Sequence, residues 1–475
     1  MGGACLRLPI DRPFPDVAHE DSTGEKWSGR LGFTLATIGS AVGIGSIWKF
    51  PYEVGSNGGG VFVAFYVAGL VLIVVPLMLA EFAIGRRGGG DPITSIAAVA
   101  RAHGAGRAWA VVGALGVLTG FLILSFYAVI GGWTLGYAFE TAVRGLPGAD
   151  ARAVRDRYQA FLASPAAMLG YQALFLVVTA VVVARGVGRG IEAAAKVLMP
   201  ALLLLMLLLA GYAMVEGDVA RTLRYLFVPA FDRVNARAAL EALGLGFFSI
   251  GVGLGLMITY AAYSRATIPL REVAIVSVLA DTAISLLAGL AVFPIVFGNQ
   301  LDPASGPGLV FVTLPLAFAR LPFGTVAAVA FFVLLFVAAL ASAISLLEVA
   351  VATLVHRRGW RRRTASAVCG VTCFVAGVPT VLSFNRWADW YPLAAVEGFA
   401  TATFFDVIDH VTSNVLLPIG GFAMALFAGW AMPARLLREP LRLGGRGTRW
   451  LLVLLRYLAP AGIAVVALGG LFLRR

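Results

Sequence analysis

The chain has 475 residues, of which 60% are hydrophobic and 13% are charged, and its mean hydropathy is +0.88. Soluble proteins carry about 25% charged residues, so this composition excludes a soluble protein and indicates a polytopic membrane protein. The net charge of +12 comes mostly from arginines clustered in loops beside apolar segments. That distribution follows the positive-inside rule, so it indicates membrane orientation rather than nucleic-acid binding.

Residues 1–25 are polar and have no apolar h-region, so they are predicted to be a disordered cytoplasmic tail rather than a signal peptide. The three cysteines show no metal-binding spacing. Cys369 and Cys373 lie in an apolar run, and we expect them to pack in the interior.

Eleven apolar segments follow, each about as long as, or longer than, the roughly 20 residues that a membrane crossing requires. They are 31–55, 61–85, 106–139, 167–185, 190–214, 238–263, 268–298, 323–355, 364–384, 402–432 and 450–472. The fold class is therefore all-α. The arginine-rich loops after segments 2, 8 and 10 predict a cytoplasmic N-terminus. Because the number of segments is odd, the C-terminus is predicted to lie outside. Arg474 and Arg475 oppose this placement of the C-terminus.

Two segments are interrupted near their centres. Gly43 and Gly45 break the first segment, and glycines 251, 253 and 255 break the sixth. One interpretation is that these glycines allow helices to pack closely. The other is that broken helices line a binding site, since unpaired backbone groups are tolerated in a membrane only beside a cavity or ligand. Each break lies in the first segment of a block of five, and this correspondence favours the binding-site interpretation. It also predicts two inverted repeats, 26–214 and 215–432. A loop and a last span follow at 433–475.

Several motifs recur in order along the chain. They are GSAVGIGSIWKFPYEVGSNGGG, PLMLAEFAIGR, GGWTLGYAF, RGVGRGIEAAAKVLMP, FFSIGVGLGLMITYAAYS, AGLAVFP, ASAISLLE and FFDVIDHVTSNVLLPIGG. This pattern, over about residues 26–432, resembles the neurotransmitter:sodium symporter family, in particular its eleven-span bacterial amino-acid transporters of the leucine-transporter type. The resemblance implies a five-plus-five inverted repeat in a bacterial inner membrane, as a monomer or weak dimer surrounded by lipid.

A substrate carboxylate requires amide N–H groups and a hydroxyl donor. The amides at Gly43 and Gly45 supply the first, and Tyr127 lies where the family places the second, although a buried tyrosine with a backbone partner is the alternative. Ala41, Phe248 and Ser249 are candidates to receive the ammonium. The resemblance assigns the side-chain pocket to Ile123, Phe248, Gly251, Leu254, Ala343 and Leu346. Monoamine carriers of the family have an aspartate where this chain has Gly43, so we expect an α-amino acid, neutral and hydrophobic or aromatic.

The resemblance also implies sodium sites. The first consists of the Ala41 carbonyl, Ser46, Ser249 and Asp281, and the second of the Gly39, Val42 and Ala338 carbonyls with Ser342. Ala341 replaces a usual ligand, so the second site is expected to be weak, completed by water or absent. Of the family's chloride ligands, Tyr66, Ser249 and Ser285 remain, whereas Leu245 and Asp281 replace a glutamine and an asparagine. A carboxylate there repels an anion, so we expect no dependence on chloride.

Lys49 and Asp409 match the family's outer gate, with Lys in place of the usual Arg. The inner pair is missing, because Gly24 and His356 occupy its positions. Trp27, Lys26, Tyr263 and Glu348 are candidates to substitute for it. Gly190 and Pro200 have the spacing that in relatives marks an unwinding segment, or they form an ordinary proline kink.

These features predict a sodium-coupled amino-acid symporter that works by alternating access. The alternative is an amino-acid sensor, or transceptor, that binds without concentrative transport. The sequence contains no metal cluster, nucleophile–base pair or phosphate loop, so a membrane enzyme is disfavoured.

Overall fold

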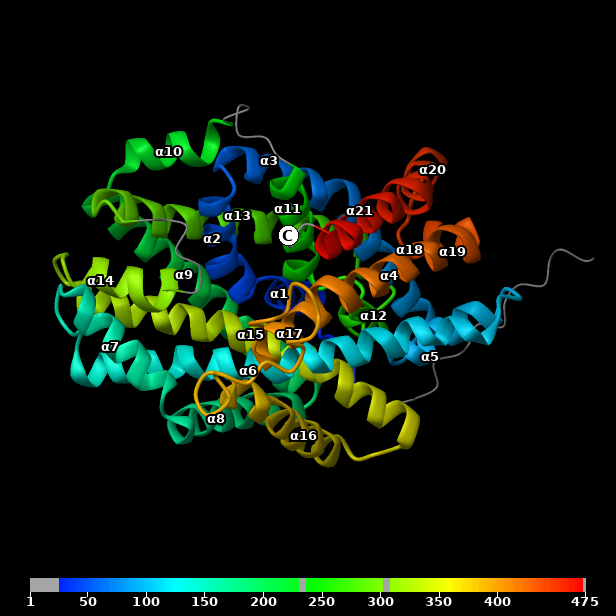
Figure 1. Ribbon diagram of the computed structural model, residues 1–475. Coiled ribbons are helices and arrows are strands. Elements are labelled where there is room, and N and C mark those ends of the chain that lie inside the picture. Colours follow the sequence, from blue (N-terminus) through cyan, green and yellow to red (C-terminus); the bar gives the residue numbers. More distant parts are fainter. Residues whose placement is uncertain (1–24, 230–235, 302–307, 473–475) are drawn as a thin grey trace, which may run out of the picture.

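The computed structural model describes residues 25–229, 236–301 and 308–472, and within these ranges the secondary structure is helical with no strand. The predicted disordered tail, apart from Glu25, lies outside the described residues, as do Arg474 and Arg475. The described chain therefore confirms the all-α class (Figure 1).

Nine helical segments of the described chain are long and apolar enough to cross a membrane. They are Gly60–Gly88, Arg107–Arg144, Pro165–Ala184, Val187–Glu216, Leu270–Gly298, Gly324–Arg358, Arg362–Leu382, Phe404–Ala431 and Gly445–Gly469. A tenth crossing is formed if α1 (Arg30–Ala41) and the helix Gly45–Ser56 count as one span bent by 53°. The predicted sixth span consists of α11 (Ala236–Ile250) and α12 (Leu256–Ala262), each too short to cross alone. The total of eleven stays a prediction.

The spans consist of α-helical turns, with a short π-helical segment in several of them and a 3-10 turn at Arg107–Trp109. Their elements are η1 (Gly45–Lys49), α2 (Phe50–Ser56), α3 (Gly60–Gly69), η2 (Leu70–Val74), α4 (Val75–Gly88), η3 (Arg107–Trp109), α6 (Ala110–Arg144), α8 (Pro165–Ala184), η4 (Val187–Glu192), α9 (Ala193–Glu216), α13 (Leu270–Gly298), α15 (Gly324–Arg358), α16 (Arg362–Leu382), α17 (Phe404–Asp409), η7 (His410–Leu416), α18 (Leu417–Leu426), η8 (Phe427–Ala431), α20 (Gly445–Val453), η9 (Leu454–Leu458) and α21 (Ala459–Phe472). Short helices connect them: α5 (Pro92–Arg101), α7 (Ala151–Leu162), α10 (Val219–Phe227), η6 (Leu309–Thr313), α14 (Leu314–Phe318) and α19 (Ala434–Arg438).

The two longest helices, α6 and α15, lie side by side through the middle of the bundle, and α8 and α16 pack against them (Figure 1). The helix α1 contacts α9, α13 and α15. Both predicted interior cysteines, Cys369 and Cys373, are buried and free. The two broken spans are therefore enclosed by continuous helices, which hold the breaks in the interior.

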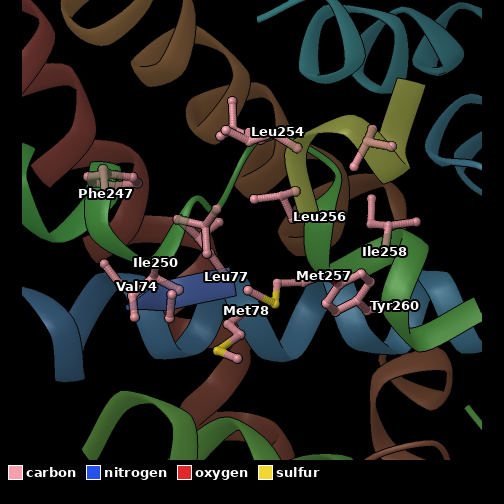
Figure 2. Packing of buried hydrophobic residues seen from close by; sticks show 14 of the residues in the cluster. Val74, Leu77, Met78, Phe247, Ile250, Leu254, Leu256, Met257, Ile258 and Tyr260 are labelled. Atoms are coloured by element: carbon pink, nitrogen blue, oxygen red, sulfur yellow. The ribbon is translucent and has the colours of Figure 1, made fainter. Parts of the chain in front are cut away.

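The helix α4 anchors the second half of the broken span 236–262. Leu77 and Met78 of α4 face Met257 and Tyr260 of α12, and all four side chains are buried (Figure 2). A side chain at Gly85 would overlap the Ile258 carbonyl, so the absence of a Cβ lets the two backbones meet. Because α12 is only seven residues long, this packing rather than its own length stabilises it.

Candidate functional site

The first break lies between α1 and η1. α1 ends at Ala41, Val42 is extended with φ −81° and ψ 107°, and the helix resumes at Gly45. The last carbonyls of one helix and the first N–H groups of the next have no intrahelical partners. Carbonyl oxygens and amide donors therefore meet at one place in the bundle interior, as the sequence predicts.

The second break spans residues 251–255, between α11 and α12. Gly251, Gly253 and Gly255 have φ of 71°, 88° and 76°, a backbone region that strongly favours glycine. The buried Glu81 carboxylate of α4 accepts a hydrogen bond from the Gly253 amide at 2.5 Å. This bond fixes the broken segment against α4.

A cavity lies between the two breaks. It is lined by Ser40, Ala41, Gly43, Gly45, Ile123, Tyr127, Phe248, Ser249, Gly251, Leu254, Leu256, Ser342 and Leu346. Every predicted substrate residue except Ala343 lies in this lining; Ala343 is buried in α15 outside it. Ser40 and Leu256 were not predicted, although each directly neighbours a predicted residue or a glycine of the break.

Tyr127 joins the first break to α6. Its hydroxyl oxygen accepts a hydrogen bond from the Ile44 amide at 3.2 Å. A Cβ at Gly43 would lie 2.5 Å from the Ser342 hydroxyl and 2.9 Å from the Tyr127 hydroxyl. The glycine therefore keeps two hydroxyl groups close to the broken backbone, and any larger residue would displace them.

The predicted first sodium site is a compact group of oxygen atoms around a fully buried carboxylate. The Asp281 Oδ1 atom accepts hydrogen bonds from Ser46 at 2.7 Å and from Ser249 at 2.8 Å. The Ser249 hydroxyl also lies 3.5 Å from the Ala41 carbonyl. All four predicted ligands converge from α1, η1, α11 and α13, and oxygen-only donors suit a hard cation.

The predicted second sodium site is partly assembled. The Ser342 hydroxyl lies 3.4 Å from the Gly39 carbonyl and 3.3 Å from the Val42 carbonyl. The Ala341 methyl faces Gly39, at 3.4 Å from where a Cβ would be. Ala338 is buried one turn earlier on α15. An apolar methyl group thus lies where a further oxygen ligand is expected in the family.

The predicted outer gate residues do not meet in this conformation. The Lys49 ammonium lies 5.1 Å from the centre of the Phe248 ring, and Asp409 accepts a hydrogen bond from Ser413. Among the described residues no ion pair joins Lys49 and Asp409. The Lys49 end of the site is therefore not closed by this pair.

Near Lys49, one amide bridges two acidic side chains. The Asn57 Nδ2 group donates to Glu53 Oε2 at 3.1 Å and to Glu241 Oε2 at 2.6 Å. Glu241 also pairs with Arg237 at 2.7 Å. Glu53 lies four residues after Lys49, one helical turn away on the same bent span. Glu53 is thus a second carboxylate within the influence of Lys49.

The end of the bundle opposite Lys49 is held together by residues near the start of the described chain. Trp27 is fully buried, and its indole N–H donates to the Tyr260 carbonyl at 2.8 Å. Ser28 donates its backbone N–H at 2.8 Å, and its hydroxyl, to the Glu192 carboxylate of η4. Residues 27 and 28 therefore connect spans 5 and 6.

A buried ion network lies beside them. Glu348 accepts from the Tyr263 hydroxyl at 2.8 Å and pairs with Arg362. Arg362 also pairs with Glu25 at 2.8 Å and donates to the Val183 carbonyl at 2.8 Å. The predicted substitutes Trp27, Tyr263 and Glu348 thus lie in this closure, whereas Lys26 is exposed.

Arg362 and Glu25 are functional candidates that sequence reasoning missed. Arg362 is one of five arginines between residues 357 and 363, and the sequence gives no signal that separates it from its neighbours. The His356 Nδ1 atom lies 2.9 Å from the Ala352 carbonyl of its own helix, and its ring stacks on Tyr263 with 6.5 Å between the ring centres. In span 5, η4 contains Gly190, and Pro200 lies inside α9.

We compared the chain with known proteins. It is 37% identical over 448 residues to the uncharacterized sodium-dependent transporter YhdH of Bacillus subtilis, covering 93% of this chain and 97% of the relative. It is 32% identical over 434 residues to an uncharacterized sodium-dependent transporter of Methanocaldococcus jannaschii, covering 87% of this chain and 83% of the relative.

Among solved structures, it is similar to MhsT in complex with L-phenylalanine, with a TM-score of 0.86 and 39% identity. That match covers 94% of this chain and 100% of MhsT. The model of the sodium:neurotransmitter symporter family matches residues 24–159 and 164–416, which include both broken spans and the buried oxygen cluster. The chain belongs to the sodium:neurotransmitter symporter family.

Proposed function

We propose that the chain is a sodium-coupled symporter that imports a neutral hydrophobic or aromatic α-amino acid across a bacterial plasma membrane by alternating access. The observation that carries the proposal is a cavity bounded by two helix breaks and joined through Ser249 to the Asp281 oxygen cluster. One enclosed space then offers amide donors, an apolar lining and a cation site. The relative MhsT, solved with L-phenylalanine, supports this substrate class.

The amino acid's carboxylate is expected beside Gly43 and Gly45. The helix that begins at Gly45 presents its N-terminus to the cavity, where unpaired N–H groups and the helix dipole favour an anion. Tyr127 adds a hydroxyl donor on the same side. With Gly43 at this position, the cavity lining formed by the described residues has no carboxylate to receive an amine, so the substrate is expected to supply its own carboxylate.

The side chain of the substrate is expected among apolar groups. Ile123, Leu254 and Leu346 line the cavity together with Phe248. A charged substrate side chain there would be desolvated without a partner, which is costly. This lining favours a neutral hydrophobic or aromatic amino acid.

Sodium is the co-transported substrate in this proposal. Asp281, Ser46, Ser249 and the Ala41 carbonyl would hold one ion, and the buried carboxylate supplies the compensating charge. The substrate carboxylate would lie beside that ion, so each raises the affinity of the other by the same factor. The second site, with Ala341 in place of a ligand, is proposed to bind sodium weakly or not at all.

The conformation supports access from the Lys49 end. Trp27, Glu348 and Arg362 fasten the opposite end, whereas Lys49 and Asp409 are apart. We propose that the fastened end faces the cytoplasm, in agreement with the distribution of arginines. Transport then requires the Lys49–Asp409 pair to form and the Arg362 network to open.

Uptake into proteoliposomes tests the proposal. Radiolabelled L-phenylalanine should accumulate above its external concentration with an inward sodium gradient, and not with potassium in its place. A Tyr127→Phe variant should bind the substrate about tenfold or more weakly, because it loses a hydrogen bond to a charged group. Saturable sodium-dependent binding without accumulation would instead indicate the amino-acid sensor, and neither binding nor uptake for any amino acid would refute the proposal.

A further inference from the structure

A guanidinium on the outer surface of spans 10 and 11 is held in one orientation. The Arg456 Nε–H donates to the Gly429 carbonyl at 2.6 Å, and the guanidinium carbon lies 5.6 Å from the centre of the Trp430 ring. The Trp430 indole N–H donates back to the Arg456 carbonyl at 3.3 Å. Three contacts between η8 and η9 therefore fix this side chain.

Gly429 makes the close approach possible. A Cβ at this position would lie 3.0 Å from the Leu455 carbonyl and 3.1 Å from Arg456 Cγ. These distances are tighter than ordinary van der Waals contact, so a larger residue would push the arginine stem away. The site depends on a small residue on one span and an arginine on the other.

The remaining donors of Arg456 have no hydrogen-bond partner among the described residues. A guanidinium has five N–H donors, and in the described chain only the Nε–H of Arg456 has a protein hydrogen-bond partner. Both Nη groups are thus available as a planar fork, the geometry that matches the two non-bridging oxygens of a phosphodiester.

Exposed aromatic rings surround this fork. Trp430 is 58% exposed and Tyr457 is 59% exposed, and their ring centres lie 5.8 Å apart. Trp430 lies at the end of the candidate span Phe404–Ala431. Tryptophan and tyrosine are enriched at the height of lipid headgroups, because their rings have an apolar body and a polar tip. The fork is therefore expected at headgroup depth.

The charge around the site selects an anionic ligand. Six arginines lie between residues 435 and 456, and the one acidic residue there, Glu439, pairs with Arg87. Arg449 lies seven residues before Arg456, on the same helix face, and is exposed. Arg442 donates to the Ala266 carbonyl, which places this basic segment at the same end of the bundle as Tyr263.

We propose that Arg456, Trp430 and Tyr457 form a binding site for the phosphodiester headgroup of an anionic phospholipid. The Arg456 fork binds the phosphate oxygens, the two rings lie at the interface beside it, and Arg449 favours a net negative lipid over a zwitterionic one. The site is separate from the substrate cavity. The proposed orientation of the protein would place this site in the cytoplasmic leaflet. Nothing else in the lipid-site proposal depends on that orientation.

Native mass spectrometry of the delipidated protein tests this site without measuring transport. Phosphatidylglycerol and phosphatidylcholine with identical acyl chains are added in equal amounts, and the retained lipid is counted. The wild type should retain phosphatidylglycerol preferentially. Arg456→Gln should lower that retention by about tenfold, since a charge-assisted bidentate contact is lost.

Arg271→Gln is the matched control, because Arg271 is exposed at the same end of the bundle and has no aromatic ring contact in the described chain. It should retain phosphatidylglycerol like the wild type. Arg456→Lys keeps the charge but removes the fork, and it should lose most of the preference. Equal retention by wild type and Arg456→Gln, equal loss in Arg271→Gln, or no preference over phosphatidylcholine would each overturn the site. If Arg456→Gln cannot be purified, unchanged retention by Arg456→Lys overturns it.

Discussion

The Tyr66 hydroxyl donates a hydrogen bond of 2.7 Å to Asp281 Oδ2, while the other oxygen of this carboxylate accepts from Ser46 and Ser249. Asp281 therefore fills the space between two groups of residues that the family resemblance assigns to different ions. One side faces the proposed sodium ligands, and the other faces the tyrosine of the chloride site.

This arrangement predicts that transport does not depend on chloride. Sodium-driven uptake should be the same in chloride and in gluconate, because the carboxylate already supplies the negative charge beside the cation. Asp281→Asn removes that charge, and we expect sodium affinity to fall by about tenfold or more, the loss of a charged ligand costing about 1.5–3 kcal/mol. Sodium titrations in both anions measure this. Chloride-dependent uptake by the wild type would contradict the prediction.

A second prediction concerns Ala341, whose methyl faces Gly39 beside the Ser342 hydroxyl. Ala341→Thr should lower the sodium concentration required for half-maximal substrate binding, because it adds an oxygen ligand. Ala341→Val is the matched control, since valine has the shape of threonine without the hydroxyl. A shift in the threonine variant alone indicates that the second site binds sodium. No shift in either variant would mean that the site is not used.

The network of Glu348 and Arg362 is expected to keep the Trp27 end closed. Glu348→Gln removes one charge of a buried ion pair, a change that costs about 3–5 kcal/mol, although Glu25 still pairs with Arg362. We expect this end to open more often. A single cysteine introduced on the Trp27 side of the cavity should then react faster with a membrane-impermeant maleimide. Tyr263→Phe, which removes only a hydroxyl bond to Glu348, should have a smaller effect. Unchanged labelling in Glu348→Gln would show that the network does not act as a gate.

Glu53 is expected to compete with Asp409 for Lys49. In Glu53→Gln the hydrogen bond from Asn57 is kept, but the negative charge one helical turn from Lys49 is lost. The Lys49–Asp409 pair should then form more easily, and the apparent affinity for substrate should rise by about two- to fivefold, the size expected of a partly exposed charge pair. Equilibrium binding in the presence of sodium measures it. Glu272→Gln, whose carboxylate pairs with Arg30 at the start of α1, is the control, and an equal rise there would argue against a specific competition.

Much of the fold follows from the sequence because a bilayer imposes simple rules. The apolar segments and the glycines that interrupt two of them are visible without any structure, and the breaks lie at 42–44 and 251–255. Most cavity residues also follow: every predicted substrate residue except Ala343 lines the cavity, whereas Ser40 and Leu256 of the lining were not predicted. Local backbone chemistry thus determines where the site lies.

Long-range ion pairs do not follow in the same way. Arg362 is separated by 337 residues from Glu25, and its partner Glu348 lies on the preceding helix. Each is an ordinary charged residue in the sequence. The packing of α15 against α16 brings Glu348 to Arg362, and the start of the described chain brings Glu25 to the same arginine. Lys49 shows the converse: the family pattern names Asp409 as its partner, but in this conformation it lies over Phe248.

The two breaks differ in their backbone. The break in span 6 contains three left-handed glycines within five residues, whereas none of Val42, Gly43 and Gly45 has a positive φ. A β-branched valine adopts the extended conformation at little cost. Glycine is free to leave the left-handed conformation, so the hydrogen bond from the Gly253 amide to Glu81 is what holds the span 6 break in place. A side chain at position 251, 253 or 255 would therefore strain the span 6 backbone, whereas the backbone angles of the span 1 break impose no such restriction.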